Sequence, residues 1–211
     1  MERRSTPNTA SIETRADGQK FISGYALVFY RDGDASTEYE LWNDDYGRAV
    51  ERITPEFARS AIEKSNDIIG VFNHDPANLL GRRSSGTLDL TIDERGLKYS
   101  IPYDETDPDH QRLAPKYKRG DLKGSSFMFR ASEKWEGPPT NEVRWLVGGD
   151  DSEIHDVGPV TNPAYAGTTS GMRDVTPELA DIRKSRLAAR VCDQRQQLDI
   201  RRRMLEMDLA K

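Results

Sequence analysis

The stretch GTLDLTIDERGLKYSIPY, residues 86–103, decides the fold class of this chain of 211 residues. Its two arms, GTLDLTI and LKYSIPY, are rich in the β-branched and aromatic residues that β-strands favour. The residues between them, DERG, are typical of a tight turn. The stretch therefore predicts a β-hairpin.

More strands are predicted on both sides of this hairpin. KFISGYALVFY, residues 20–30, is aromatic and β-branched, and Gly24 within it is typical of a bulge. The other predicted strands are DIIGVFN (67–73), GSSFMFRAS (124–132), VRWLVG (143–148) and EIHDVGPV (153–160). The polar stretch at residues 31–47 is predicted to be a loop.

Two short helices interrupt the predicted strands. Thr54 and Pro55 are typical of an N-cap and a first helical position, and they predict a helix from about Glu56 to Ser65. The face that this helix would bury is Phe57, Ala58, Ala61 and Ile62. A second helix is expected to start at Asp107 and Pro108 and to end near Pro115. Because strands dominate, we expect a mainly β fold with helices, of the α+β kind, built as a barrel or sandwich with helical cover.

The chain divides into three predicted zones. Residues 1–19 are polar and are expected to form a flexible leader, and residues 20–171 hold the strands. Residues 175–211 are expected to form one helix that starts at Thr176 and Pro177. Its apolar stripe is Leu187, Val191, Leu198, Leu205 and Leu209. This length and spacing predict a coiled coil or partner-docking helix, with a solvated helix as the alternative.

Composition limits the classes of partner. The net charge is −5, and the balance from Val175 onward is +3, so the rest of the chain carries −8. An acidic body argues against nucleic acid as the main partner. Because no apolar run approaches the roughly 20 residues that span a bilayer, we expect no membrane segment. The single cysteine, Cys192, cannot form an internal disulfide, which suits a reducing cytoplasm.

Two segments offer candidate groups for acid–base and nucleophilic chemistry. His74 follows the strand DIIGVF and precedes a turn, a common place for a general base. Ser125 and Ser126 begin an aromatic strand in which Ser125 shares a face with Phe127 and Phe129. If the phenylalanine face packs in the core, Ser126 is left on the face that can line a cleft.

A third segment offers candidate partners for His74. His155 and Asp156 lie next to each other on a predicted strand, so they face opposite ways and one of them can orient the imidazole. Asp156 suits this role better because a carboxylate is charged at neutral pH. Arg82 and Arg83 are candidates for holding an oxyanion, or else surface charges.

A metal site and a cofactor site are both poorly supported. The residues that could ligate zinc are His74, Asp75, His110, His155 and Asp156. They contain no short-spaced ligand pair of a recognised kind, and the chain has no Walker-type or dinucleotide-binding glycine loop. We therefore expect no metal and no cofactor. The residues alone predict a strand-rich domain that is a candidate hydrolase.

Several segments, in this order, resemble the prohead (capsid maturation) protease family of tailed phages. They are GYALVFY (24–30), ITPEFARSAI (53–62), FNHDPANLLGR (72–82), GTLDLTIDERGLKYSIPYDET (86–106), RGDLKGSSFMF (119–129) and DVGPVTNPAYAGT (156–168). The resemblance implies a β-barrel surrounded by helices, like that of the herpesvirus protease assemblin. It also implies a serine endopeptidase whose histidine is His74 and whose serine is Ser126, with Ser125 as the less favoured neighbour.

The third catalytic position of the family falls on Asp156. In the herpesvirus relatives a histidine stands there, which keeps His155 as an alternative. The chain departs from the common E-V-S form of this element, because it has Asp156, Val157 and Gly158.

The resemblance also implies a biological role. Members cleave scaffolding protein or the scaffold-like region of the major capsid protein, and often themselves, inside the assembling prohead in the host cytoplasm. A homo-oligomer, such as a dimer, is expected by analogy with the herpesvirus relatives. The competing interpretations are a non-enzymatic capsid-assembly or scaffold protein with the same fold, and a metal-dependent hydrolase.

Overall fold

The computed structural model describes residues 1–7, 9–45, 47–65, 67–163, 180–188, 192, 195–196 and 200–202. The chain forms two compact units, Met1–Asp174 and Val175–Lys211, and each is described by itself. All strands that the structure describes belong to the first unit.

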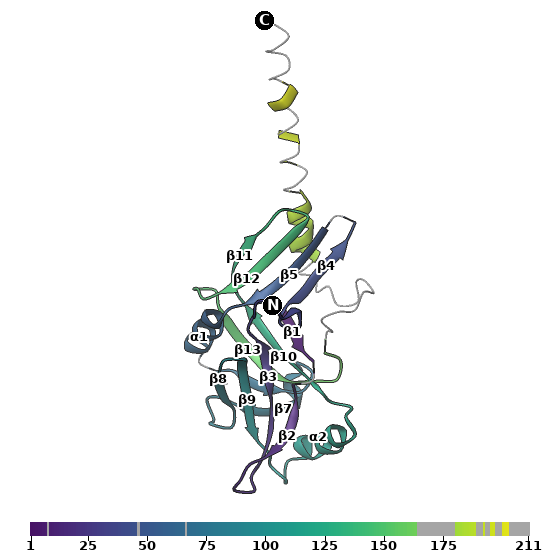
Figure 1. Ribbon diagram of the computed structural model, residues 1–211. Coiled ribbons are helices and arrows are strands. Elements are labelled where there is room, and N and C mark those ends of the chain that lie inside the picture. Colours follow the sequence, from purple (N-terminus) through teal and green to yellow (C-terminus); the bar gives the residue numbers. More distant parts are fainter. Residues whose placement is uncertain are drawn as a thin grey trace, which may run out of the picture. The chain divides into compact units, whose positions relative to one another are not determined.

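Three sheets build the first unit (Figure 1). The first has the strand order β1 (Glu2–Thr6), β10 (Gly124–Arg130), β13 (Glu153–Val160), β6 (Ile69–Val71) and β7 (Leu79–Arg82). The second has the order β2 (Ser11–Thr14), β3 (Lys20–Val28), β9 (Gly96–Pro102) and β8 (Asp89–Ile92). The third has the order β11 (Ser132–Glu136), β12 (Asn141–Val147), β5 (Gly47–Ile53) and β4 (Tyr39–Asp44).

The expectation of a mainly β fold with a few helices is confirmed. The described strands form these three sheets, and no closed barrel is formed among them. Barrel closure requires a continuous ladder of hydrogen bonds around the sheet. A strand pattern shows that a segment is extended, but it does not show which strand it will pair with.

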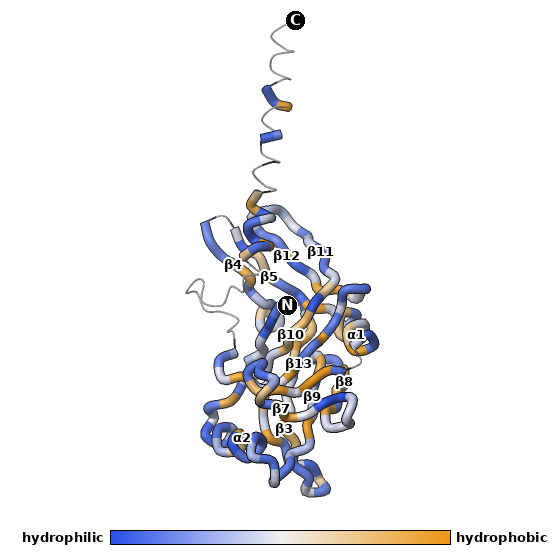
Figure 2. Tube along the Cα trace, turned by 180° about the vertical axis from the view of Figure 1, so that it is seen from behind, coloured by the Kyte–Doolittle hydropathy of each residue, from blue (hydrophilic) through white to orange (hydrophobic). Residues whose placement is uncertain are grey.

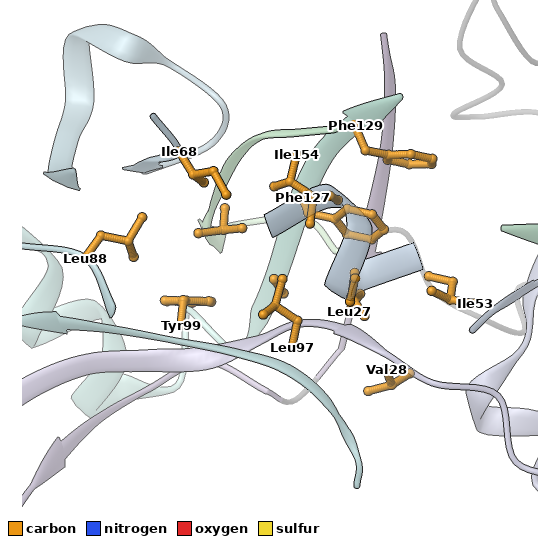
Figure 3. Packing of buried hydrophobic residues seen from close by; sticks show 14 of the residues in the cluster. Leu27, Val28, Ile53, Ile68, Leu88, Leu97, Tyr99, Phe127, Phe129 and Ile154 are labelled. Carbon is orange, nitrogen blue, oxygen red and sulfur yellow. The ribbon is translucent and has the colours of Figure 1, made fainter. Parts of the chain in front are cut away.

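The predicted hairpin is β8 and β9, which pair antiparallel with Leu90 opposite Tyr99. This hairpin belongs to the second sheet. The core lies between the second sheet and the first sheet, with β3 packed against β10. Figure 3 shows Leu97 and Tyr99 of β9 facing Phe127 and Ile154 from the other sheet. In Figure 2 orange segments gather around β8, β9 and β10, whereas β4 and β11 are mostly blue to white.

Helix α1 (Pro55–Lys64) covers the core at the aromatic face of β10. The Thr54 hydroxyl caps its first turn by accepting from the backbone N–H of Phe57 at 3.3 Å. Its buried face is Phe57, Ala58 and Ala61, and Ile62 is half-buried. Phe57 packs edge-on against Phe129, with 5.7 Å between ring centroids. This helix was predicted with its cap and its buried face.

Helix α2 (Pro108–Arg119) is longer than predicted. It begins at the N-cap Asp107 as expected, but it continues through Pro115 and ends at Gly120, whose φ of 78° is left-handed. The prediction of an end near Pro115 is therefore wrong. Pro115 removes one helical hydrogen bond, and it does so at an exposed position where water can replace the missing donor.

Two regions that were predicted to lack structure contain strands. Residues 1–19 do not form a flexible leader, because β1 pairs with β10 and β2 pairs with β3. The predicted loop at residues 31–47 contains β4, which pairs with β5. Both regions are polar because their side chains meet ion-pair partners or solvent, and the hydrophobic pattern does not reveal such strands.

A buried cluster of ion pairs attaches β1 to the third sheet. Arg4 and Arg144 both bond to Glu51, which is 0% exposed, and both also bond to Glu2. The Arg4 fork meets Glu51 with Nε–Oε1 at 2.7 Å and Nη2–Oε2 at 2.8 Å. Glu133 adds a further contact to Arg144. Buried charges require such complete pairing, so this cluster holds β1 in place.

The second unit is helical where it is described, at residues 180–188, 192, 195–196 and 200–202. The stripe residue Leu187 lies in this part, and Val191, Leu198, Leu205 and Leu209 lie outside the described residues. Cys192 is exposed. Among the described helices, none has the length and hydrophobicity needed to cross a membrane.

The ion-pair cluster predicts an acid-dependent loss of stability. Burial alone would raise the pKa of Glu2, but the hydrogen bonds and charges of Arg144 and Arg4 hold it below its ordinary 4.5. Because the unfolded chain then binds the proton more tightly, this stabilisation is present above pH 4.5 and is lost as the pH falls through the lower, folded-state pKa.

We expect Glu2→Gln to lower the free energy of unfolding by roughly 2–3 kcal/mol near neutral pH, and by less near pH ~3. Urea unfolding of both proteins at these two pH values measures the difference. Glu40→Gln, which removes a charge from the exposed surface, is the control for net charge. If the difference in unfolding free energy between Glu2→Gln and wild type is the same at both pH values, the proposed link between the Glu2 pKa and stability is contradicted.

Candidate active site

Three side chains from the first sheet form one chain of hydrogen bonds. His74 follows β6, Ser126 lies on β10 and Asp156 lies on β13 between them. The His74 Nδ1–H donates to Asp156 Oδ1 at 2.6 Å, and His74 Nε2 lies 2.6 Å from Ser126 Oγ. The structure thus brings together the histidine, the favoured serine and the favoured acid of the sequence-based prediction.

Strand pairing sets the positions of the serine and the acid. In the antiparallel pair of β10 and β13, Met128 lies opposite Asp156 and Ser126 lies opposite Gly158. Ser126 and Asp156 therefore lie one step apart on the same face, since side chains of a strand alternate. Asp156 also pairs in parallel with Ile69 on β6. The chain that leaves β6 therefore places His74 beside Ser126 and Asp156.

The turn that carries His74 has an unusual backbone. Asn73 and His74 have φ values of 56° and 57°, a left-handed conformation that is costly for residues other than glycine. Asn73 is held by β13, because its N–H donates to the Pro159 carbonyl at 3.0 Å and its Oδ1 accepts from the Thr161 N–H at 2.9 Å. Asp75 caps the following turn by accepting from Ala77 N at 2.9 Å. These bonds hold the imidazole in one orientation.

Gly158 allows β13 to approach the His74 turn. A Cβ at this position would lie 2.0 Å from the backbone oxygen of Val71, much closer than a non-bonded carbon atom can come. Glycine therefore has a local structural reason at position 158, because only glycine fits beside Val71.

The less favoured candidates lie on the opposite strand faces. Ser125 Oγ is 3.0 Å from the hydroxyl of Tyr99, in the interior between the sheets. A Cβ on Gly24 would lie 2.3 Å from Ser125 Oγ, so glycine at this position allows the two strands to approach closely. The bulge predicted at Gly24 is not there, because the irregularity of β3 lies between Tyr25 and Leu27. His155 Nε2 lies 3.5 Å from Glu153 Oε2. Asp156, rather than His155, is the residue bonded to His74.

The remaining candidates make structural contacts. Arg83 donates to the carbonyls of Ile62 and Ser65 at the end of α1, at 2.6 and 2.9 Å, and Arg82 pairs with Asp67. His110 Nδ1 accepts from the Asp104 N–H at 2.9 Å and Nε2 donates to the Leu80 carbonyl at 2.8 Å. The described residues contain no cluster of His, Cys, Asp or Glu arranged to hold a metal ion.

The geometry suits proton transfer from a serine hydroxyl to an imidazole. A carboxylate bonded to Nδ1 fixes the tautomer that leaves Nε2 free to accept a proton, and it stabilises the imidazolium that results. Both distances of 2.6 Å lie within the range that a nucleophile and its base require. The arrangement can therefore generate a serine nucleophile without a metal ion taking part in its activation.

The site is closed in this structure. Ser126 is 0% exposed, and the side chains of His74 and Asp156 are 9% and 5% exposed. Besides His74, the Ser126 hydroxyl contacts the Arg4 carbonyl oxygen at 2.7 Å and the Ser5 hydroxyl at 3.1 Å. Arg4 and Ser5 were not predicted to be part of the site, because no sequence signal in a polar terminal segment indicates that it covers a distant serine.

We expect Gly158→Ala to displace the His74 turn. The added methyl group must push Val71 and the following residues away, at a cost of about 1–3 kcal/mol in unfolding free energy. Because His74 lies three residues after Val71, the same shift should lengthen its contact with Ser126.

Urea unfolding measures the first effect, and the rate of reaction of Ser126 with a serine-directed fluorophosphonate measures the second. Gly86→Ala is the matched control, since Gly86 also has a positive φ but lies in a turn with open space around it. Labelling of Gly158→Ala at the rate of the Gly86 variant would contradict this role for Gly158.

A family model described as caudovirus prohead serine protease matches residues 8–179. No curated protein matches the chain, and no solved structure matches it. The match covers most of the first unit and includes all three residues of the hydrogen-bond chain.

Proposed function

Because the chain belongs to the caudovirus prohead serine protease family, we propose that it is a serine endopeptidase that uses Ser126, His74 and Asp156 to cleave capsid-assembly proteins during prohead maturation. The observation that carries this proposal is the continuous chain of hydrogen bonds from Asp156 through His74 to Ser126. It unites residues 52 and 82 positions apart in the sequence.

In the acylation step His74 Nε2 takes the proton of Ser126 as Oγ attacks a peptide carbonyl. The Asp156 carboxylate stabilises the imidazolium. The tetrahedral intermediate then collapses as His74 gives its proton to the leaving amine, and an ester to Ser126 remains.

In the deacylation step His74 acts in the same two roles. It removes a proton from water, which attacks the ester, and it returns this proton to Ser126. In both steps the imidazole of His74 activates the attacking oxygen.

The substrates that we propose are the scaffolding protein or the scaffold-like region of the major capsid protein, and the chain itself. These are the proteins available inside an assembling prohead, where an enzyme of this family acts. A dimer remains an expectation for this chain, and the helix predicted for residues 175–211 is a candidate for docking to the capsid proteins.

We expect Ser126→Ala and His74→Ala to abolish cleavage when the chain is co-expressed with the capsid and scaffold proteins of its phage. Asp156→Asn should lower the rate on the order of 10³–10⁴-fold, because it favours the wrong tautomer of His74. Mass spectrometry of the capsid proteins measures cleavage.

Ser125→Ala is the matched control, since Ser125 is adjacent on the strand but faces the interior. Cleavage that persists in Ser126→Ala would refute the serine assignment. Wild-type chain that cleaves nothing would favour a non-enzymatic capsid-assembly protein, and loss of cleavage with a chelator would favour a metal-dependent hydrolase.

A further inference from the structure

We propose that the groove along β10 that residues 2–6 occupy is the substrate groove, and that it selects an extended peptide with arginine before the cleaved bond and an acidic residue two positions earlier. The chain's own N-terminal strand fills this groove in the structure. This inference rests on the proposed function, because it names the substrate class of that site.

The first observation is the position of β1 beside the nucleophile. β1 runs antiparallel to β10 as its outer neighbour, and Ser5 lies opposite Ser126. Pairing of an extended peptide with a strand edge is a common mode of peptide binding. The peptide group in contact with Ser126 Oγ is the one between Arg4 and Ser5, whose carbonyl oxygen is 2.7 Å away. In a bound substrate this position belongs to the bond that is cleaved.

The second observation is the pocket that receives the Arg4 side chain. Glu51 is 0% exposed and meets the guanidinium with both carboxylate oxygens, at 2.7 and 2.8 Å. A planar two-point contact of this kind recognises arginine more strongly than lysine. The Arg4 guanidinium also lies over the Phe129 ring, 5.5 Å from its centroid. The pocket therefore fits an arginine just before the cleaved bond.

The third observation extends the pattern by two residues. Glu2 lies on the same face of β1 as Arg4, because side chains of a strand alternate. Its Oε1 accepts from Arg144 Nη2 at 2.6 Å, and Arg144 is 2% exposed. A substrate would thus offer an acidic residue to Arg144 and an arginine to Glu51. Arg3, between them, is exposed and is not selected.

The contacts of Ser126 indicate that β1 also restrains the nucleophile. The hydroxyl has one proton, yet two acceptors compete for it, His74 Nε2 at 2.6 Å and the Arg4 carbonyl at 2.7 Å. A proton held by the carbonyl is not transferred to the imidazole. A substrate in trans must therefore displace β1, whose ion pairs with Glu51 and Arg144 resist this.

Cleavage of a displacing peptide follows the steps derived above. A bond forms between Ser126 Oγ and the arginine carbonyl carbon, and the bond from this carbon to the next residue's nitrogen breaks. The serine proton passes through His74 to this nitrogen. Water then splits the ester and leaves a peptide that ends in arginine.

The test uses a fluorescence-quenched peptide with the sequence of residues 1–8, MERRSTPN, and the intact protein. In the first matched peptide, citrulline replaces the arginine that corresponds to Arg4, which keeps the shape and removes the charge. In the second, glutamine replaces the glutamate that corresponds to Glu2. We expect kcat/KM to fall roughly tenfold or more for citrulline, since a hydrogen bond between charged groups is lost. Equal rates for the parent and citrulline peptides would overturn the proposal.

Variants of the protein test the pocket and its occupant. Arg4→Gln should hydrolyse the parent peptide roughly tenfold or more faster than wild type, because its own strand competes less well. Arg3→Gln is the matched control on the exposed side of the strand and should equal wild type. Glu51→Gln should lose the preference for arginine over citrulline, whereas Glu38→Gln, which changes the residue just before β4 and outside the proposed pocket, should keep it. An Arg4→Gln variant slower than wild type would overturn the occupancy of the groove.

A serine-directed fluorophosphonate separates this inference from the proposed function. Labelling of wild type but not of Ser126→Ala, together with no cleavage of any peptide, would overturn the inference alone. Absence of both labelling and cleavage in wild type and in Arg4→Gln would overturn the proposed function as well. If Glu51→Gln does not fold, the peptide series with wild type and Arg4→Gln still decides the question.

Discussion

The antiparallel pairing of β10 with β13 is the constraint on which the candidate site depends. It places Ser126 opposite Gly158 and Met128 opposite Asp156, so the serine and the carboxylate share one face of the sheet. The parallel pairing of β13 with β6 then sets where the chain leaves the sheet, and His74 stands on the turn that follows. A shift of one residue in either pairing would turn one of the three side chains to the other face. The proposed chemistry therefore rests on the register of three neighbouring strands.

The same strand β10 separates two environments. Its aromatic face, Phe127 and Phe129, packs against Phe57 of α1 and anchors the strand in the core. Its other face holds Ser126 beside His74. Because the aromatic packing stiffens the strand, the serine has little freedom to leave the imidazole. The left-handed turn at Asn73 and His74 does the same for the base, with bonds to Pro159 and Thr161 that offset its backbone cost.

The buried ion-pair cluster affects both the stability of the fold and, in the proposed substrate groove, the access of a peptide to Ser126. Removing a single member would leave the other buried charges with fewer partners, which costs more than an exposed ion pair contributes. Glu51 and Arg144 therefore need a guanidinium and a carboxylate beside them, and β1 supplies both through Arg4 and Glu2. In the proposed substrate groove, a peptide with the same two charges would satisfy the same requirement. The charges that stabilise the closed chain would then be those that choose the substrate.

The sequence by itself predicted those elements that are specified by residues close together in the chain. The hairpin of β8 and β9, the cap and buried face of α1, and the two faces of β10 follow from turn residues, capping residues and alternation. It also singled out His74, Ser126 and Asp156, because the segments around them resemble those of the prohead protease family and follow one another in the same order. It did not predict β1, β4 or the length of α2, because polar strands and an exposed proline give weak or misleading local signals.

Only the tertiary structure decided which of these residues meet. A strand pattern does not show which strand will be its partner. The register between distant segments therefore decided that the strands form three open sheets rather than a closed barrel. The same register decided that Asp156, rather than His155, lies beside His74. The covering of Ser126 by Arg4 and Ser5 depended on the same cause. Residues 4 and 126 become neighbours through backbone pairing, which carries no side-chain signature, and through ion pairs whose members are far apart in the sequence.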